Sequence, residues 1–247
     1  MSSNALEFRR GVVKPVECLR AGWDLIKGQY WLFLGITLAA LFVGSAVPMG
    51  ILMGPMFCGL HLALLRRQRG EPVAFDTLFK GFDYFVDSLV ATLVQVIPFM
   101  LILIPTYAVS FLLFYSSFKP GRRGEAPDLF PFFAFVGVIF LVIIVSSIII
   151  GVFFIFTYPL IVDRRLSGLN AVKTSARAAA ANLGGVFGLV LLMTLLSYAG
   201  VLLCYVGVFF VLPLHFAAYA IAYRQVFPET GHTLSPDAEQ PPPPNVF

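Results

Sequence analysis

Charged residues are scarce in this chain of 247 residues, where Asp, Glu, Lys and Arg make up only 12% of the sequence, against about 25% in a soluble domain. Hydrophobic residues make up 59%, which is more apolar surface than the core of one soluble domain can hide from water. This composition excludes an ordinary soluble domain. The formal charge of +4 is typical of Lys and Arg beside a membrane, so we expect no nucleic-acid partner.

Side chains that could carry chemistry are also few. No Asp, Glu, Lys or Arg lies in the middle of an apolar run, where a buried ionisable group would indicate catalysis or transport. The three cysteines have neither disulfide nor zinc-site spacing. His61 and His215 are the main candidates for a metal site or a proton relay, with Gln95 a weaker third, but interhelical hydrogen bonding is the favoured interpretation. We therefore expect a non-enzymatic protein with no catalytic residue, metal or cofactor.

Long apolar runs are what the sequence has instead. Four runs without charge each exceed the roughly 20 residues that cross a bilayer, and they are Tyr30 to Leu65, Ser88 to Phe118, Leu129 to Val162 and Asn182 to Tyr223. The first and last are long enough for two short helices. Val47 to Gly50 supplies a turn in the first run, and Gly200 lies near the middle of the last.

The distribution of Lys and Arg decides how many times the chain crosses. If the two long runs are single spans, these cations divide evenly between the two sides. If both runs are split, every cation near the spans lies inside except Lys119, Arg122 and Arg123. The positive-inside rule thus favours six crossings with both termini in the cytoplasm. The predicted spans are Tyr30 to Val47, Ile51 to Leu65, Asp87 to Tyr107, Phe132 to Ile155, Gly185 to Leu203 and Val206 to Tyr223.

Three further segments have one apolar and one polar helical face: Pro15 to Gly28, Phe75 to Val86 and Gly168 to Leu183. Their spacing is typical of helices lying flat at a membrane surface, although covering the cytoplasmic end of the bundle would explain it too. The expected fold is all-α: a polytopic membrane bundle of about six transmembrane helices with three interfacial amphipathic helices. Their order suggests three repeats, residues 15–70, 75–165 and 167–227.

The expected organisation has three parts. Residues 1–14 are expected to form a flexible N-terminus and residues 15–227 the membrane domain. Residues 228–247 are polar and rich in proline, which is typical of a disordered cytoplasmic tail.

Two sets of residues are candidates for packing and for lipid contact. Small residues four apart let helices approach closely, and the candidates are Gly50, Gly54, Gly184 and Gly188. A dense basic patch near the fourth and fifth spans could hold anionic lipid headgroups, and its members are Arg164, Arg165, Lys173 and Arg177. Anchoring of the topology alone would also explain these cations.

Three stretches carry a resemblance to a known family. They are Gly54-Pro55-Met56 with Gly59; Arg69-Gly70-Glu71 followed by Phe75 to Phe82; and Tyr158 to Arg164, followed by Ala171 to Ser175 and closed by Ala222-Tyr223-Arg224. Over about residues 15–227 the chain resembles a large group of bacterial six-helix membrane proteins of unknown function, related to membrane domains associated with glycerophosphodiester phosphodiesterases. The resemblance implies a helical bundle in the bacterial inner membrane, and it implies no activity.

Three classes of function follow as hypotheses. The first is a non-enzymatic scaffold, assembly factor or lipid-interacting component, with the phospholipid bilayer and its anionic lipids as partners. The alternative is a transporter or carrier of small apolar or lipid-like cargo, which should have an internal cavity with polar groups. The third is an intramembrane enzyme, which should bring His61 and His215 together with another polar group.

Overall fold

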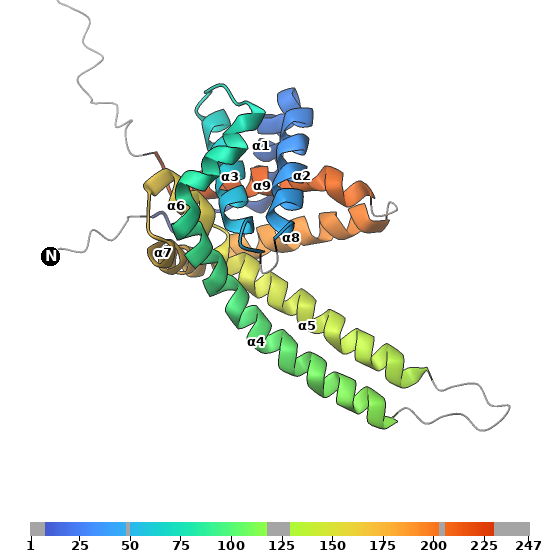
Figure 1. Cartoon of the computed structure of the whole chain (residues 1–247). Helices are drawn as coiled ribbons and strands as arrows, with labels where there is room; N and C mark the ends of the chain where they lie inside the picture. Colours follow the sequence, from blue (N-terminus) through green and yellow to red (C-terminus); the bar gives the residue numbers. More distant parts are fainter. Residues whose placement is uncertain (1–7, 48–49, 118–128, 203–205, 230–247) are drawn as a thin grey trace, which may run out of the picture.

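The computed structural model describes residues 8–47, 50–117, 129–202 and 206–229 (Figure 1). Within these ranges the regular elements are all helical, which confirms the all-α prediction. They are α1 (Pro15–Ile26), η1 (Lys27–Gln29), α2 (Tyr30–Ser45), α3 (Met53–Gln68), η3 (Phe75–Tyr84), α4 (Phe85–Ser117), α5 (Phe130–Phe154), α6 (Thr157–Arg164), α7 (Gly168–Ala181), α8 (Leu183–Leu202) and α9 (Val206–Val226), where η marks a 3₁₀ helix.

Three helical hairpins, α2–α3, α4–α5 and α8–α9, make up most of the molecule (Figure 1). Each follows a helix in one of the segments expected to be amphipathic, which are α1, η3 and α7. In the part of the chain that the structure describes, five stretches of helix are long and apolar enough to cross a membrane, and they begin at Pro15, Phe75, Phe130, Leu183 and Val206. The chain therefore has the helices that a multi-pass membrane protein needs.

The predicted second span corresponds to α3, which together with α2 is the shortest of the described hairpin helices. Its 16 residues make a helix about 24 Å long at about 1.5 Å per residue, less than the roughly 30 Å of a bilayer core. The helix contacts α2, η3, α4, α6 and α9, so it lies in the middle of the described structure. Ten of its residues are buried.

The helical run that begins with α5 breaks at Ile155 and Phe156, between α5 and α6. The fourth span was predicted to end at this point. Ser175 of α7 enters this break: its Oγ donates to the Phe153 carbonyl at 2.8 Å and accepts from the Phe156 N–H at 3.2 Å. Pro159 has no N–H for a bond to the Ile155 carbonyl. A side chain inserted into the ladder and a proline together explain why α6 begins as a separate helix.

Residues 8–14, expected as part of a flexible N-terminus, instead pack against the ends of α8 and α9. The Arg9 N–H donates to the Val226 carbonyl at 2.9 Å. The buried Asn182 side chain accepts from the Val12 N–H at 3.1 Å and donates to the Arg9 carbonyl at 3.0 Å. Residues 1–7, and 230–247 of the predicted tail, lie outside the described residues.

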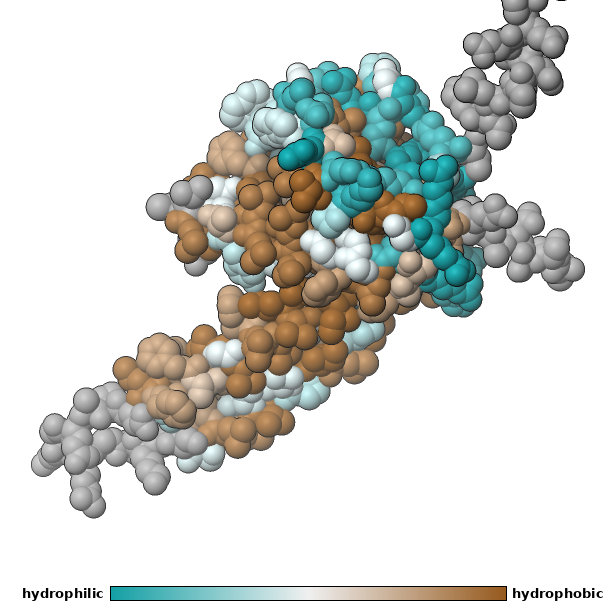
Figure 2. All heavy atoms as spheres, turned by 180° about the vertical axis from the view of Figure 1, so that it is seen from behind, coloured by the Kyte–Doolittle hydropathy of each residue, from teal (hydrophilic) through white to brown (hydrophobic). Residues whose placement is uncertain are grey.

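Polarity divides the molecule into two ends. Figure 2 shows hydrophilic residues gathered over one end, while the projecting α4–α5 hairpin is mostly hydrophobic. We call the first region the polar end; it comprises α7 and the C-terminal ends of α3, α6 and α9. The apolar surface is therefore concentrated on the hairpins, away from the polar end.

Candidate functional site

A buried carboxylate joins three helices at the polar end. The Asp163 side chain is only 5% exposed, and its two oxygens accept two hydrogen bonds from the Arg224 guanidinium, at 2.9 and 3.0 Å. The Tyr223 hydroxyl donates to the same carboxylate at 2.7 Å, and Arg69 donates through Nη2. Bidentate, charge-assisted bonds of this kind are among the strongest that side chains make. Asp163 thereby fastens the ends of α3, α6 and α9 to one another.

Other charges complete this ion cluster. The Arg164 Nε lies 3.3 Å from Asp163, and its Nη2 donates to the Pro228 carbonyl. Glu229 pairs with Arg69 and with Arg224, both at 3.2 Å. We call Arg69, Asp163, Arg164, Tyr223, Arg224 and Glu229 the Asp163 cluster. Because each of its charges has an oppositely charged partner within it, its geometry is suited to holding helices together.

A pocket of about 440 Å³ lies between α3, α4, α5 and α6. Most of its wall is apolar, from Met53, Phe57, Val96, Phe99, Met100 and Ile150. Its polar lining residues are Thr92, Gln95, Ser147 and Tyr158. Its volume falls within the range of about 300–1,000 Å³ that is typical of small-molecule sites. Among the described residues, no charged side chain lines it.

Hydrogen bonds order the polar wall of this pocket. The Tyr158 hydroxyl lies 3.1 Å from Thr92 Oγ1 and 3.4 Å from Gln95 Oε1, and Thr92 Oγ1 donates to the Ser88 carbonyl at 2.8 Å. The single proton of Tyr158 can serve only one of its two neighbours. The structure describes no other hydrogen bond for the Gln95 side chain, so its amide retains donor capacity at the pocket wall.

The His61 and His215 rings both contact Phe216, each with its centroid 5.9 Å from the Phe216 centroid, and the His61 ring also stacks on Tyr158 of the pocket wall at 6.3 Å. His61 Nδ1 donates to the Phe57 carbonyl at 2.8 Å. Both residues belong to α3, so this bond lies within one helix and is not the predicted interhelical bond. His61 Nε2 and His215 Nδ1 are buried without a partner in the described structure. The enzyme hypothesis requires the two histidines to meet each other and a third polar side chain. No described hydrogen bond joins them in this way.

The four candidate glycines differ in their surroundings. A Cβ on Gly54 would lie 2.6 Å from the Ser88 carbonyl oxygen, and one on Gly188 would lie 3.1 Å from Pro15 Cγ. Gly50 has φ +66°, a left-handed conformation that glycine adopts readily at the turn between α2 and α3. The prediction that Gly184 packs closely against another helix is wrong, because a Cβ there would meet nothing within 4 Å.

The predicted basic patch divides into two parts. Arg165, Lys173 and Arg177 are exposed, and no ion pair in the described part of the chain involves them. Arg164 instead turns into the Asp163 cluster, where its side chain is only 12% exposed. Arg165 adopts φ 50° in the left-handed region, so the chain turns between these neighbours and directs one inward and the other outward. Arg164 is therefore not part of an exposed headgroup patch.

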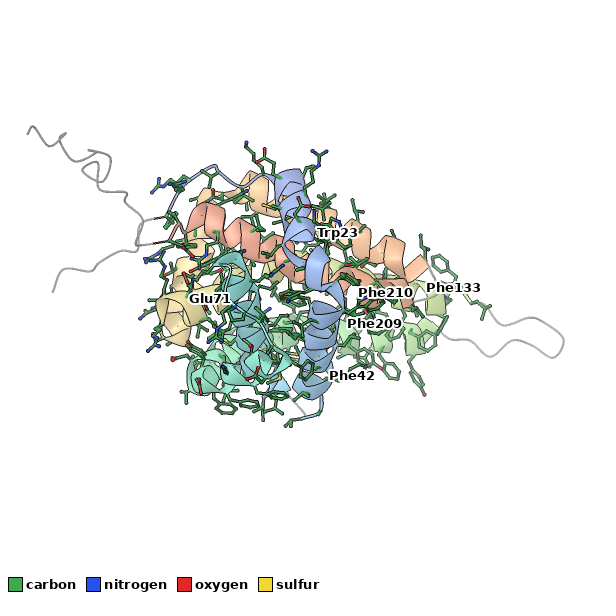
Figure 3. All side chains as sticks on the ribbon, turned by 90° about the horizontal axis from the view of Figure 1, so that it is seen from above. Trp23, Phe42, Glu71, Phe133, Phe209 and Phe210 are labelled. Carbon is green, nitrogen blue, oxygen red and sulfur yellow. The ribbon has the colours of Figure 1, made fainter. Side chains whose placement is uncertain are left out.

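Both tryptophans of the chain lie in an exposed aromatic group where α1 meets α2. The Tyr30 ring is 5.8 Å from Trp23 and 5.7 Å from Trp31, and its hydroxyl donates to the Phe210 carbonyl of α9 at 2.7 Å. Figure 3 shows Trp23, Phe209 and Phe210 along one side of the molecule and Glu71 toward the other. Trp and Tyr prefer the level where a membrane meets water.

Sequence reasoning missed the pocket and the Asp163 cluster, although it had noticed some of their members. Gln95 was considered only as a weak partner for the histidines, and Tyr158 only as part of a motif. A signal for the cluster was present, because the stretches that contain Arg69, Asp163-Arg164 and Tyr223-Arg224 all supply residues to it. Comparisons with family models, with curated proteins and with solved structures found no match.

Proposed function

We propose that this chain is a bacterial inner-membrane protein that crosses the bilayer six times, with its polar end and both termini in the cytoplasm. Large apolar side chains are exposed along α4 and α5, and examples are Leu101 at 69%, Leu112 at 65%, Phe133 at 64% and Leu141 at 61%. Lipid is a suitable solvent for such surfaces. The short helix α3 is the sixth span, because a bilayer thins locally around a short helix.

The proposal places α1, η3 and α7 at the membrane surface. Its support is that α1 exposes Val16 and Trp23, and η3 exposes Phe75, Phe79 and Phe82. Apolar side chains exposed on helices that also carry charge are typical of interfacial helices. The aromatic group around Tyr30 then lies at the same level. We also propose membership of the six-helix family that the chain resembles, supported by the convergence of its motif stretches near Asp163.

The activity we propose is non-enzymatic: the chain is a lipid-interacting scaffold or assembly component that holds anionic phospholipid at its cytoplasmic surface. One observation carries this proposal. Arg165, Lys173 and Arg177 are exposed and without described acidic partners, whereas nearby Arg164 is paired with Asp163. Near an anionic leaflet each such cation contributes about 1 kcal/mol.

Lipid retention during purification tests this activity. The double variant Lys173→Gln, Arg177→Gln should weaken retention of phosphatidylglycerol or cardiolipin by about 30-fold, since two cations contribute about 2 kcal/mol together. The matched control is Lys14→Gln, Lys27→Gln, because each of these lysines pairs with an acidic neighbour, Glu17 or Asp24. Lipid quantified by mass spectrometry should fall only in the first variant. Equal retention in both would leave these cations as topology signals.

Labelling with a membrane-impermeant thiol reagent in intact cells tests the topology. Ser116→Cys, near the tip of the α4–α5 hairpin, should react, whereas Ser167→Cys, at an exposed position between α6 and α7, should react only after the cells are opened. Both are introduced into a background in which the native Cys18, Cys58 and Cys204 are replaced. Reaction of Ser167→Cys in intact cells would contradict six crossings.

A carrier of lipid-like cargo is the second candidate, and the pocket between α3, α4, α5 and α6 favours it. A carrier must release its cargo across or between membranes, whereas a lipid-holding scaffold does not. Transfer of a fluorescent lipid between the leaflets of vesicles containing the purified protein distinguishes the two.

A further inference from the structure

The chemistry of the pocket specifies an uncharged ligand. Tyr158, Thr92 and Gln95 provide hydroxyl and amide groups, and the described lining includes no Asp, Glu, Lys, Arg or His. A charged headgroup inside this pocket would lose its hydration without gaining a counter-charge, which is strongly unfavourable. A neutral hydroxyl or ester group, by contrast, would find both donors and acceptors on the polar wall.

The size of the pocket suits one hydrocarbon chain. A volume of about 440 Å³ accommodates about 15 groups the size of a water molecule, whose share of liquid volume is about 30 Å³. A methylene group is of similar size. One acyl chain of a membrane lipid therefore fills the pocket, with the last carbons of a longer chain extending through its opening, and two chains do not fit.

The position of the pocket gives the ligand an orientation and a route of entry. Gln95 lies ten residues beyond Phe85, the first residue of α4, or about 15 Å along the helix, and the apolar Phe99 and Met100 lie further from the polar end. Met100 is 38% exposed and Ser147 is exposed, so the pocket opens on the surface of the α4–α5 hairpin. A lipid entering sideways would keep its polar group nearer the polar end.

We propose that this pocket binds a neutral single-chain lipid, with an ester or hydroxyl oxygen accepting from the Gln95 amide, a hydroxyl donating to the Tyr158 oxygen, and its chain among Val96, Phe99 and Met100. The inference rests on the proposed insertion of the α4–α5 hairpin in a bilayer and is independent of the anionic-lipid patch. Gln95 supplies the donors that its own hydrogen bonds leave unused. Tyr158, held by Thr92, orients the ligand.

Binding to the delipidated full chain in detergent, followed by native mass spectrometry, tests the proposal with monooleoylglycerol as the probe. One molecule should bind, and Gln95→Leu and Tyr158→Phe should each weaken binding about five- to tenfold, because each removes a neutral hydrogen-bonding group. Tyr107→Phe is the matched control, since it removes the same hydroxyl from an exposed position on α4 outside the pocket, and its binding should equal that of the parent. Equal binding by parent, Gln95→Leu and Tyr158→Phe would overturn the proposal, as would tighter binding of oleate or dioleoylphosphatidylglycerol.

Photo-crosslinking locates the probe without relying on variants that change the pocket. A monooleoylglycerol analogue with a diazirine on its chain should label peptides containing Val96 to Met100, and labelling confined to Tyr107 to Phe114 would place the lipid on the outer hairpin and overturn the proposal. The Lys173→Gln, Arg177→Gln variant should bind the probe as the parent does. Loss of anionic-lipid retention and loss of probe binding are thus separate outcomes, so the proposed anionic-lipid activity and this inference fail independently.

Discussion

Helix α3 and the outer half of the α4–α5 hairpin are both apolar, yet their surroundings are opposite. In α3, Met56, Leu60 and Leu64 are no more than 1% exposed. In the hairpin, Leu112 and Leu141 remain more than 60% exposed. Helix α3 is in fact less hydrophobic than α4 and α5, so hydropathy does not explain why α3 is the buried one. What distinguishes α3 is its small residues, since Gly54 and Gly59 let other helices come into contact with its backbone.

This difference indicates where stability resides. In a bilayer, apolar side chains are shielded from water whether they face lipid or protein, so helices associate through close packing and polar contacts. The region around α3 and the Asp163 cluster has both, while the outer half of the hairpin has mainly the contact of α4 with α5. We therefore expect substitutions to be most harmful at the polar end and least harmful at the hairpin tip.

The largest effect is expected from Asp163→Asn. The side chain keeps its shape but loses its charge, which leaves Arg69 and Arg224 without their central partner, and removing one member of a buried ion pair lowers stability by about 3–5 kcal/mol. Unfolding in detergent, followed by the fluorescence of Trp23 and Trp31, measures this change. Glu229→Gln is the control, because its side chain is 50% exposed and exposed pairs contribute about 0–1 kcal/mol. Equal stability of the two variants would mean that the cluster does not hold the helices together.

A smaller effect is expected from Gly54→Ala. The new Cβ would lie 2.6 Å from the Ser88 carbonyl oxygen and 2.7 Å from Thr92 Oγ1, so α3 and α4 must move apart, and overpacking of this kind lowers stability by about 1–3 kcal/mol. Gly137→Ala in α5 is the matched control, because a Cβ there meets nothing within 4 Å and alanine favours helix by about 1 kcal/mol. The same unfolding measurement should show opposite signs for the two variants. A neutral Gly54→Ala would show that the α3–α4 contact is loose.

The hairpin helices were predictable because they come from long apolar runs that proline, glycine or charge interrupts. Helix α2, for example, spans Tyr30–Ser45 where Tyr30 to Val47 was predicted. The break before α6 depends on Ser175, which lies about 20 residues away on another helix, and no local signal reveals that contact. Likewise, Arg164 and Arg165 are equivalent in sequence, and only the left-handed conformation of Arg165 separates their roles.

The candidate sites were less predictable because they depend on the register between helices distant in sequence. Tyr158 meets Gln95 across a separation of 63 residues, and Asp163 meets Arg69 across 94. Periodicity shows which face of a helix is apolar but not which residues of two helices lie at the same height. The number of charges at the polar end was evident from the sequence, but the choice of Asp163 as the common partner was not.

The smallest effect is expected from Leu112→Ala, and its comparison with Leu64→Ala tests the difference between the two regions most directly. Leu64 is 1% exposed and Leu112 is 65% exposed, so the same atoms are removed from a packed site and from a site facing lipid. Truncation of a packed leucine leaves a cavity and lowers stability by about 2–5 kcal/mol. We expect the lower end of this range, because in a bilayer the leucine stays out of water even when the helices have separated. Truncation at Leu112 opens no cavity, so the change should stay within about 0.5 kcal/mol. Unfolding of both variants in lipid nanodiscs gives the two values. A loss at Leu112 as large as that at Leu64 would show that protein, in a second copy or a partner, covers the outer hairpin, and this part of the chain would then belong to an interface.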